Sequence, residues 1–320
     1  MTMRVAFIGA GKMASDLMAC VDDVDGAEIT AVCDIDESAA GAAADPRGAA
    51  VFTDHETLFA DHDFDAVFLA IPPFAYGNQA ELAVEHGVDL FVEKPVGLRP
   101  EDAREVEELL RGADIVTGSG YVFRYDRITE RTLDLVEDRN IGLLHARYWS
   151  GLPNSEWGYE MARSGSDVNI RTTHVLDTMR YLAGDVDRVY AADTDRIGTD
   201  EVDYADGVAA TVEHESGVVG TVNSSITAPE WTVEIDVAGE DFQLSLDYAA
   251  QSLTGTVDGQ EVDFDGTCDR YRREVAGFIE ACERGDQSHV RSSFSDATRT
   301  LELNWAVIES AERAEPLELS

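Results

Sequence analysis

The fold of the first half of the chain is decided by the stretch Arg4-Val5-Ala6-Phe7-Ile8-Gly9-Ala10-Gly11-Lys12-Met13-Ala14. Its first five residues are typical of a short buried strand, and helical spacing of apolar residues begins at Met13. Gly9 permits a tight turn, Gly11 lets the backbone approach a pyrophosphate, and the small Ala14 lets the helix pack on the strand. The pattern predicts a dinucleotide-binding turn, with an ordinary strand-to-helix turn as the alternative.

An acidic residue stands where such a site needs one. The next strand, Glu28–Cys33, ends at Asp34, 20 residues beyond Ala14. A carboxylate there hydrogen-bonds the adenosine ribose hydroxyls. Asp36 and Glu37 follow with further negative charge and would repel a 2′-phosphate, so we expect NAD, with NADP possible.

Strands and helices continue to alternate through the first third of the chain. We expect strands at 65–70, 88–92 and 115–118, and helices at 79–86 and 100–111. This order predicts a doubly wound parallel sheet with right-handed crossovers, which binds ligands at the carboxyl ends of its strands. The cofactor-binding candidates at those ends are Gly9, Gly11, Lys12, Met13, Asp34, Ile71, Pro72, Glu93 and Lys94.

Lys94 is one of only two lysines in 320 residues, and the other is Lys12 in the glycine-rich turn. Lys94 follows the apolar run Leu90–Val92 and Glu93, and Pro95 then stops the strand. An ammonium at this edge stabilises a developing alkoxide, and burial lowers the pKa of a lysine toward neutral pH. We therefore expect Lys94 to be catalytic.

The second half of the chain has a different periodicity. Two-residue alternation predicts strands at 142–150, 208–213, 218–224, 242–248 and 253–264. Trp231, Val233, Ile235 and Val237 are expected on one strand face. Helices are expected at 127–138, 174–182, 270–284 and 295–313. The fold class is therefore α/β, with an N-terminal Rossmann domain (1–121) and a C-terminal α+β domain (122–320) that has a large, mostly antiparallel, open-faced sheet.

The net charge of −40 comes from 64 acidic residues spread over the whole chain. A distributed acidic surface with little lysine is typical of proteins from salt-accumulating halophiles, with a basic protein partner as the rival interpretation. A nucleic-acid partner is disfavoured, because phosphate binding needs a positive surface. We expect no membrane span, no signal peptide and a cytoplasmic location. The four cysteines have no metal-binding or disulfide spacing, so we expect no metal.

The fingerprint, Asp34, Glu93-Lys94-Pro95 and a His-x-x-Asp helix from His174 to Asp177 together resemble the Gfo/Idh/MocA oxidoreductase family. The resemblance covers nearly the whole chain. It implies an NAD(P)-dependent dehydrogenase or reductase that acts on a hydroxyl or ketone carbon of a sugar, cyclitol or related polyol. His174 is then the second catalytic candidate, because an imidazole near neutral pKa suits the hydroxyl proton.

The chain departs from the family at one catalytic position. The family places an aspartate four residues before the histidine, where this chain has Ile170. Neighbouring Asp167 and Asn169 are expected on extended chain, where an offset of one residue points a side chain the other way. Asp177 is expected either to orient the imidazole or to be an ordinary helix-terminus acid.

Further expectations concern the substrate and the partners. Two alternatives to a dehydrogenase stay open: a non-catalytic dinucleotide-binding regulator, and an NAD-using glycosidase of the same family. We expect a homodimer or homotetramer formed through the second domain's sheet. The candidates for substrate contact, through aromatic faces and polar groups, are Tyr121, Arg124, Trp157, Asn169 and Asp177.

Overall fold

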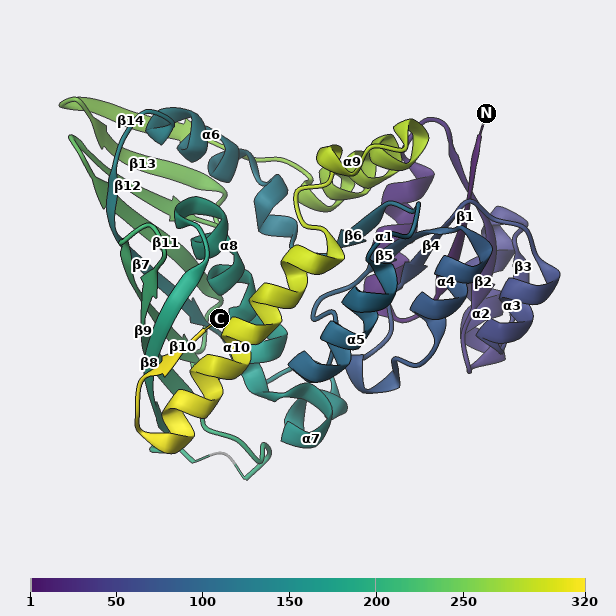
Figure 1. The fold of residues 1–320 in the computed structure, drawn as a ribbon, viewed down its shortest axis with the longest axis horizontal. Helices are drawn as coiled ribbons and strands as arrows, with labels where there is room; N and C mark the ends of the chain where they lie inside the picture. The colour runs from purple at the N-terminus through teal and green to yellow at the C-terminus, as the bar shows by residue number, and fades with distance from the viewer. Residues whose placement is uncertain (1, 199, 320) are drawn as a thin grey trace. The chain divides into compact units, whose positions relative to one another are not determined.

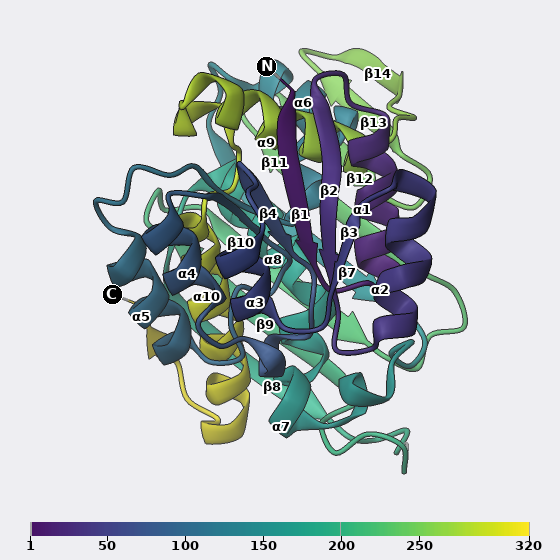
Figure 2. The same cartoon turned by 90° about the vertical axis from the view of Figure 1, so that its right-hand side faces the viewer.

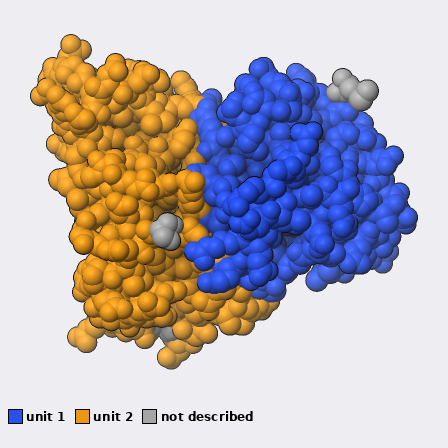
Figure 3. Space-filling model, viewed as in Figure 1, with its two compact units in different colours: residues 1–97, 101–121, 269–298 blue, residues 98–100, 122–268, 299–320 orange. Residues whose placement is uncertain are grey.

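The structure is a computed structural model that describes residues 2–198 and 200–319. It contains two compact units, coloured separately in Figure 3. Unit 1 comprises residues 1–97, 101–121 and 269–298, and unit 2 comprises residues 98–100, 122–268 and 299–320.

The units differ from the predicted domains in two segments: Leu98–Pro100 packs in unit 2 and not in the first domain, and Asp269–Thr298 packs in unit 1 and not in the second. The reason for the longer difference is helix α9 (Arg270–Arg284). Its Phe278 packs edge-on against the rings of Phe68 and Phe91, with ring centroids 5.3 Å away in each case. Burying an aromatic side chain between two others is a large apolar gain, so α9 completes the core of unit 1.

Unit 1 is built on a six-stranded sheet with the strand order β3-β2-β1-β4-β5-β6. All of its strand pairs are parallel, as the alternation of strands and helices predicts. The central strands are buried on both faces, which explains their continuous apolar runs. The strands are β1 Met3–Ile8, β2 Ala27–Cys33, β3 Ala50–Phe52, β4 Ala66–Leu69, β5 Asp89–Val92 and β6 Thr117–Ser119.

Helices cover both faces of this sheet, with α1 and α2 on one side and α3, α4 and α5 on the other (Figure 2). They are α1 Lys12–Asp22, α2 Glu37–Ala44, α3 His55–Asp61, α4 Gln79–His86 and α5 Pro100–Leu110. The elements α2, β3 and α3 were not predicted. The side chains of Asp36 and Asp54 cap the two helices by accepting hydrogen bonds from backbone N–H groups, so the start signals were present in the sequence.

Unit 2 contains a nine-stranded sheet with the order β14-β13-β12-β11-β7-β10-β9-β8-β15. Its pairs are antiparallel except for β10 with β7, which is parallel. The predicted fold class is therefore confirmed. The strands are β7 Ile141–Trp149, β8 Val186–Thr194, β9 Gly207–His214, β10 Val219–Ser225, β11 Thr232–Gly239, β12 Phe242–Asp247, β13 Ser252–Val257, β14 Gln260–Asp265 and β15 Leu317–Glu318.

One predicted run, 253–264, is two strands joined by a hairpin. Asp258 and Gly259 form the turn between β13 and β14, with φ angles of 53° and 72°. A two-residue turn with positive φ at both positions matches the right-handed twist of the flanking strands. The Asp-Gly pair is a strong signal for such a turn. It was not predicted because the alternation of apolar and polar residues continues on both sides of it.

The two faces of the large sheet differ. Helices α6 (Arg127–Val136), α8 (Thr173–Ala183) and α10 (Phe294–Arg313) lie on one face (Figure 1). Val233, Ile235 and Val237 of β11 are fully buried beneath them, as predicted. Trp231 does not share that environment, since it precedes the strand and is 47% exposed. No helix of the described residues covers the other face (Figure 1).

Short helical turns make up the remaining regular structure. The π-helix Val168–Thr172 leads directly into α8, and α7 (Met161–Ser164) precedes it. Among the described residues, no helix has the length and apolar character needed to cross a membrane. The other turns are 3₁₀ helices at Asp45–Arg47, Pro73–Ala75, Val122–Tyr125, Glu156–Tyr159 and Gln287–His289.

Candidate active site

The glycine-rich turn after β1 has the shape that its sequence predicts. Gly9 has a φ of 107°, and a Cβ added there would lie 2.4 Å from the carbonyl oxygen of Ala70, so only glycine fits. A Cβ on Gly11 would meet nothing within 4 Å among the described residues. Gly11 is also the N-cap of α1, and its helix start has no side-chain cap. The first-turn N–H groups are therefore available to an anion.

Asp34 lies against this turn at the end of β2. Its Oδ2 accepts a hydrogen bond from the backbone N–H of Ala10 (2.7 Å), and its Oδ1 accepts one from that of Asp36 (2.9 Å). These two bonds fix the carboxylate beside the glycine-rich turn while each oxygen keeps a further lone pair. The next side chain, Ile35, is 96% exposed. Ile35 was not predicted to belong to the site; its only signal in the sequence is an apolar residue among acidic ones.

The other two cofactor-binding candidates from the glycine-rich turn, Lys12 and Met13, have partners outside it. Lys12 is exposed, and its ammonium pairs with the carboxylate of Asp16 one turn along α1. Met13 is partly buried against the core of unit 1. At the end of β4, Ile71 is half-buried, and its Cγ2 would lie 3.0 Å from a Cβ on Gly9. Pro72 is half-buried next to it.

Glu93 is buried at the end of β5, only 6% exposed. Its Oε2 accepts a hydrogen bond from the backbone N–H of Lys94 (3.0 Å). A Cβ on Gly120 would lie 2.8 Å from the Glu93 carboxyl carbon, so the glycine after β6 makes room for this side chain. Burial raises the pKa of Glu93 to about 7, against the opposing effect of the Lys94 charge.

Lys94 itself is half-buried, and the peptide bond between it and Pro95 is cis. The hydroxyl of Tyr76 lies 2.9 Å from the carbonyl oxygen of Glu93 and 3.1 Å from that of Pro95, so it holds the backbone on both sides of the lysine. Tyr76 was not predicted to belong to the site, because a contact made 17 to 19 residues away leaves no local pattern in the sequence.

In unit 2, His174 lies in the first turn of α8 and is buried. Its ring packs on Phe123, with centroids 5.0 Å apart, and Phe123 in turn stacks on Tyr248. Aromatic packing of this kind restricts the ring orientation of an imidazole.

The segment before His174 is not extended as predicted, because Val168–Thr172 is a π-helix. Ile170 is buried within it. Asp167 and Asn169 have other partners: the carboxylate of Asp167 accepts hydrogen bonds from the hydroxyls of Thr172 (3.1 Å) and Ser224 (3.0 Å). The amide of Asn169 donates to the carbonyl of Ser164 (3.0 Å). These contacts are structural.

Arg124 and Asp177, both candidates for substrate contact, bind each other. The guanidinium donates from Nε to Asp177 Oδ2 (2.8 Å) and from Nη2 to Oδ1 (2.6 Å), and the pair is almost wholly buried. The hydroxyl of Thr300 donates to the same carboxylate. Asp177 therefore anchors Arg124, and the structure gives it a role other than that of a helix-terminus acid.

Two aromatic candidates complete the set. Tyr121 is fully buried in unit 1. Trp157 is half-buried in the 3₁₀ helix Glu156–Tyr159 of unit 2, and a Cβ on its neighbour Gly158 would lie 3.4 Å from Ile170. The turn that carries Trp157 thus packs beside the residue that replaces the family's aspartate.

Two segments of the chain match models of known protein families. Residues 3–121 match the model described as "Oxidoreductase family, NAD-binding Rossmann fold", and residues 135–245 match the GFO/IDH/MocA C-terminal domain. The chain belongs to the Gfo/Idh/MocA family. It is an NAD(P)-dependent oxidoreductase.

Relatives in this family span most of the chain. D-xylose 1-dehydrogenase (NADP(+)) 2 of Haloferax volcanii is 27% identical over 314 residues, covering 91% of this chain and 92% of that protein. Inositol 2-dehydrogenase 2 of Saccharopolyspora erythraea is 30% identical over 301 residues, covering 89% and 87%. The Haloferax relative agrees with the halophilic composition.

Solved structures of other oxidoreductases share the fold. An oxidoreductase from Agrobacterium radiobacter in complex with NAD+, L-tartaric acid and magnesium has a TM-score of 0.90 at 22% identity, covering 99% of this chain and 98% of that one. Levoglucosan dehydrogenase in complex with NADH and levoglucosan has a TM-score of 0.88 at 19% identity, covering 99% of each chain.

The cofactor of this family fits the residues that unit 1 presents. The open space over Gly11, the helix start without a side-chain cap and the fixed carboxylate of Asp34 suit a pyrophosphate and a ribose. All lie at the carboxyl ends of neighbouring parallel strands. When bound, the nicotinamide supplies a hydride acceptor or donor.

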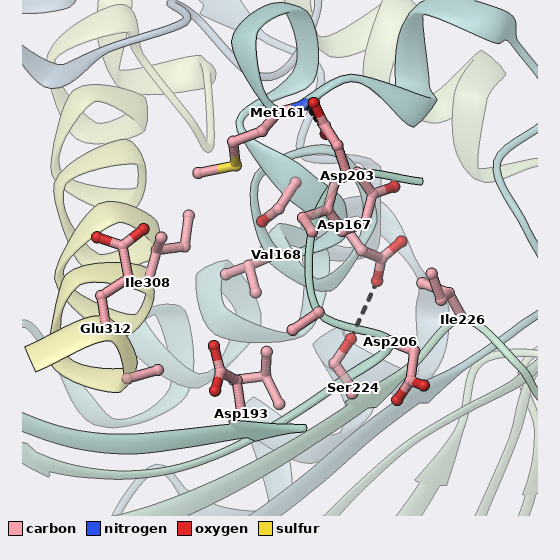
Figure 4. Close-up of a pocket in the computed structure, with 16 residues that line it drawn as sticks. Met161, Asp167, Val168, Asp193, Asp203, Asp206, Ser224, Ile226, Ile308 and Glu312 are labelled. Carbon is pink, nitrogen blue, oxygen red and sulfur yellow. Dashed lines mark hydrogen bonds between the residues drawn. The ribbon is translucent and has the colours of Figure 1, made fainter. Parts of the chain in front are cut away.

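Unit 2 also holds an acidic cavity of about 210 Å³ that contains none of the predicted site residues (Figure 4). Asp206 is held there by the backbone N–H groups of Ile197 and Gly198. Within residues 2–198 and 200–319, no group of three or more histidine, cysteine or acidic side chains is arranged to hold a metal ion. The carboxylates that line the cavity are Asp167, Asp193, Asp203, Asp206 and Glu312.

Proposed function

We propose that this protein transfers a hydride between NAD(P) and the CH–OH carbon of a sugar, cyclitol or related polyol. The observation that carries the proposal is Glu93-Lys94-Pro95 at the carboxyl end of β5, on the same edge of the NAD-binding sheet as the glycine-rich turn after β1 and Asp34 after β2. The names of the Haloferax and Saccharopolyspora relatives, a xylose and an inositol dehydrogenase, support the substrate class. Unit 1 is the proposed cofactor domain, and unit 2 is the proposed substrate domain.

For the cofactor, we assign the pyrophosphate to the turn at Gly9 and Gly11 and the adenosine ribose to Asp34. Ile71, Pro72 and Glu93 line the strand ends beyond it, with Lys12 and Met13 at the rim of the turn. NAD is the expected cofactor, because Asp34 repels a 2′-phosphate.

In the oxidative direction, the hydroxyl of the substrate loses a proton while its carbon loses a hydride. His174 accepts the hydroxyl proton on its imidazole. The ammonium of Lys94 donates a hydrogen bond to the same oxygen and stabilises the developing alkoxide. With Ile170 in place of the family's aspartate, these two groups act without a third. The half-buried Trp157 offers an aromatic face to the sugar ring, whereas the fully buried Tyr121 offers none.

A panel of sugars and cyclitols, tested with NAD and with NADP in multimolar salt, is the direct test of this function. Absorbance of the reduced nicotinamide should rise with one substrate class. The variant Lys94→Met should then lose at least about 100-fold in kcat, because an electrostatic group at the reacting oxygen is removed. Unchanged turnover in that variant would refute the role of the lysine.

A non-catalytic dinucleotide-binding regulator is the second candidate. It is favoured by one observation, the buried Ile170 four residues before His174. Tight NAD binding by calorimetry with no turnover on the whole panel supports this reading, whereas measurable turnover on any member excludes it.

Association through the open face of the large sheet is also proposed. Leu143 (59% exposed) and Trp149 of β7 and Tyr190 of β8 lie on this face, and exposed large apolar residues in one region mark association sites. Sedimentation in high salt should show a dimer or tetramer, and Leu143→Asp should shift it toward monomer. Monomer alone in the unaltered protein would contradict the proposal.

A further inference from the structure

Three residues after the catalytic motif belong to a different unit from the motif itself. Gly97 and Glu101 lie in unit 1, while Leu98, Arg99 and Pro100 pack with unit 2. Lys94 is only four residues before Leu98 along the chain. Whatever holds Leu98–Pro100 therefore restrains the backbone that continues from Lys94.

Trp305, on α10, holds this segment within unit 2. Its indole Nε1 donates a hydrogen bond to the carbonyl oxygen of Leu98 (2.9 Å). The guanidinium of Arg99 lies over its ring, 3.7 Å from the centroid. Trp305 is buried, whereas Arg99 is exposed. A partly buried hydrogen bond and a cation–π contact thus fix two successive residues to one side chain.

The preceding residue on α10 holds the approach to His174. The amide of Asn304 donates to the Thr173 hydroxyl (2.8 Å) and to Asn169 Oδ1 (3.2 Å). Thr173 directly precedes His174, and Asn169 lies in the π-helix. A Cβ on Gly165, the residue that ends α7, would lie 3.1 Å from Trp305 and 2.8 Å from the Asn169 amide, so the two contacts are closely packed together.

We propose that Asn304 and Trp305 are positioning residues that fix the approaches to both proposed catalytic groups on one turn of α10. Trp305 acts through the chain leading from Lys94, and Asn304 acts through the start of α8. A helix is a rigid support, and a misplacement of about 1 Å costs up to about 100-fold in rate. The inference rests on the proposed roles of Lys94 and His174.

Trp305→Phe is the informative variant, because it keeps an aromatic ring and removes the N–H donor. We expect kcat to fall by about 10-fold or more, with a smaller change in KM and a shifted pH profile of kcat. A merely structural role would lower the amount of folded protein and leave kcat per folded enzyme and its pH profile unchanged. Circular dichroism in high salt measures that folded fraction.

Matched variants complete the experiment. Trp231→Phe makes the same chemical change at a partly exposed position before β11 and should leave kcat unaltered. Arg99→Ala removes only the exposed cation and should lower kcat by a few-fold without unfolding the chain. If Trp305→Phe does not fold, Arg99→Ala carries the test alone, and an unchanged kcat and pH profile in it would overturn the proposal.

Lys94→Met, assayed in parallel, separates this inference from the proposed function. Lost activity in Lys94→Met with an unaltered kcat in folded Trp305→Phe overturns the positioning role and leaves the function standing. Full activity in Lys94→Met refutes the function of the lysine and removes the ground of the positioning role with it.

Discussion

Ile35 leaves nearly all of its side chain in solvent, immediately after the carboxylate that faces the glycine-rich turn. We propose that the adenine of the cofactor stacks on this apolar side chain. The carboxylate of Asp34 favours an unmodified ribose, because it would repel a 2′-phosphate.

The double substitution Asp34→Ser/Ile35→Arg should reverse this preference. It removes the charge that repels a 2′-phosphate and adds one that attracts it. We expect kcat/KM for NAD to fall by about 10- to 100-fold, because the ribose loses its hydrogen bonds to a charged carboxylate. We expect kcat/KM for NADP to rise. Steady-state kinetics with both cofactors measures the ratio. Glu37→Gln is the control, and an unchanged ratio in the double variant would contradict the assignment.

Glu93 has a consequence for stability. Burial raises its pKa from 4.5 to about 7, so between these values the folded chain binds a proton that the unfolded chain has released. Glu93 therefore contributes about 3 kcal/mol to the unfolding free energy. This contribution is fully present below pH 4.5 and is lost as the pH rises through 7.

Glu93→Gln should remove that dependence, because an amide of the same shape carries no proton to lose. The loss in unfolding free energy between about pH 5 and pH 8 should shrink by about 3 kcal/mol relative to the unaltered protein. Denaturant unfolding in high salt at both values measures it. Equal pH slopes in the two proteins would show that Glu93 does not ionise in this range.

At the scale of elements, the Arg124–Asp177 pair joins the 3₁₀ helix Val122–Tyr125 to α8, the helix that carries His174. Both charges are buried, so each depends on the other for compensation. The pair thus fixes α8 against the segment that contains Phe123, the ring on which His174 packs.

Asp177→Ala should lower the unfolding free energy by about 3–5 kcal/mol, because it leaves the arginine charge buried and uncompensated. The double variant Arg124→Met/Asp177→Leu should recover most of that loss. Denaturant unfolding of the three proteins in high salt checks both expectations. A double variant that is no more stable than Asp177→Ala would show that packing, and not charge, is what the pair supplies.

Helices, strands and turns were predictable where a sequence pattern extended over several residues. The β1 turn, Asp34 and the α9 boundaries followed from spacing alone, and the structure has α9 at the predicted residues 270–284. Helix α2 was missed because Glu37–Ala44 is mostly alanine and lacks an apolar stripe. The π-helix before α8 was missed because no residue type signals it.

Pairings between distant residues were not predictable at all. Arg124 and Asp177 each had a plausible separate role, and only their contact across 53 positions showed that they neutralise each other. The same holds for Tyr76 with Glu93 and for Trp305 with Leu98. The periodicity of a single sequence predicts helices and strands, but it does not predict which side chains contact each other.

At the scale of the whole molecule, the charge of −40 sets the conditions under which the chain folds. Charges of one sign repel over a Debye length, which shrinks from about 10 Å at 0.1 M salt to about 3 Å at 1 M. We therefore expect the thermal midpoint to rise steeply with KCl and the chain to lose secondary structure at low salt. Circular dichroism melts across a KCl series measure this, with sucrose as a control that does not screen charge. A midpoint that does not change with KCl would contradict this account.

The return of Asp269–Thr298 to unit 1 has a consequence for the order in which the protein is made. When residues 1–121 leave the ribosome, Phe68 and Phe91 still lack the ring of Phe278 that packs against them. The cofactor-binding half therefore matures only near the end of translation, after the large sheet has been synthesised. A fragment cut after residue 121 should be aggregation-prone, and a useful isolated cofactor domain would need α9 joined back to it through a short linker.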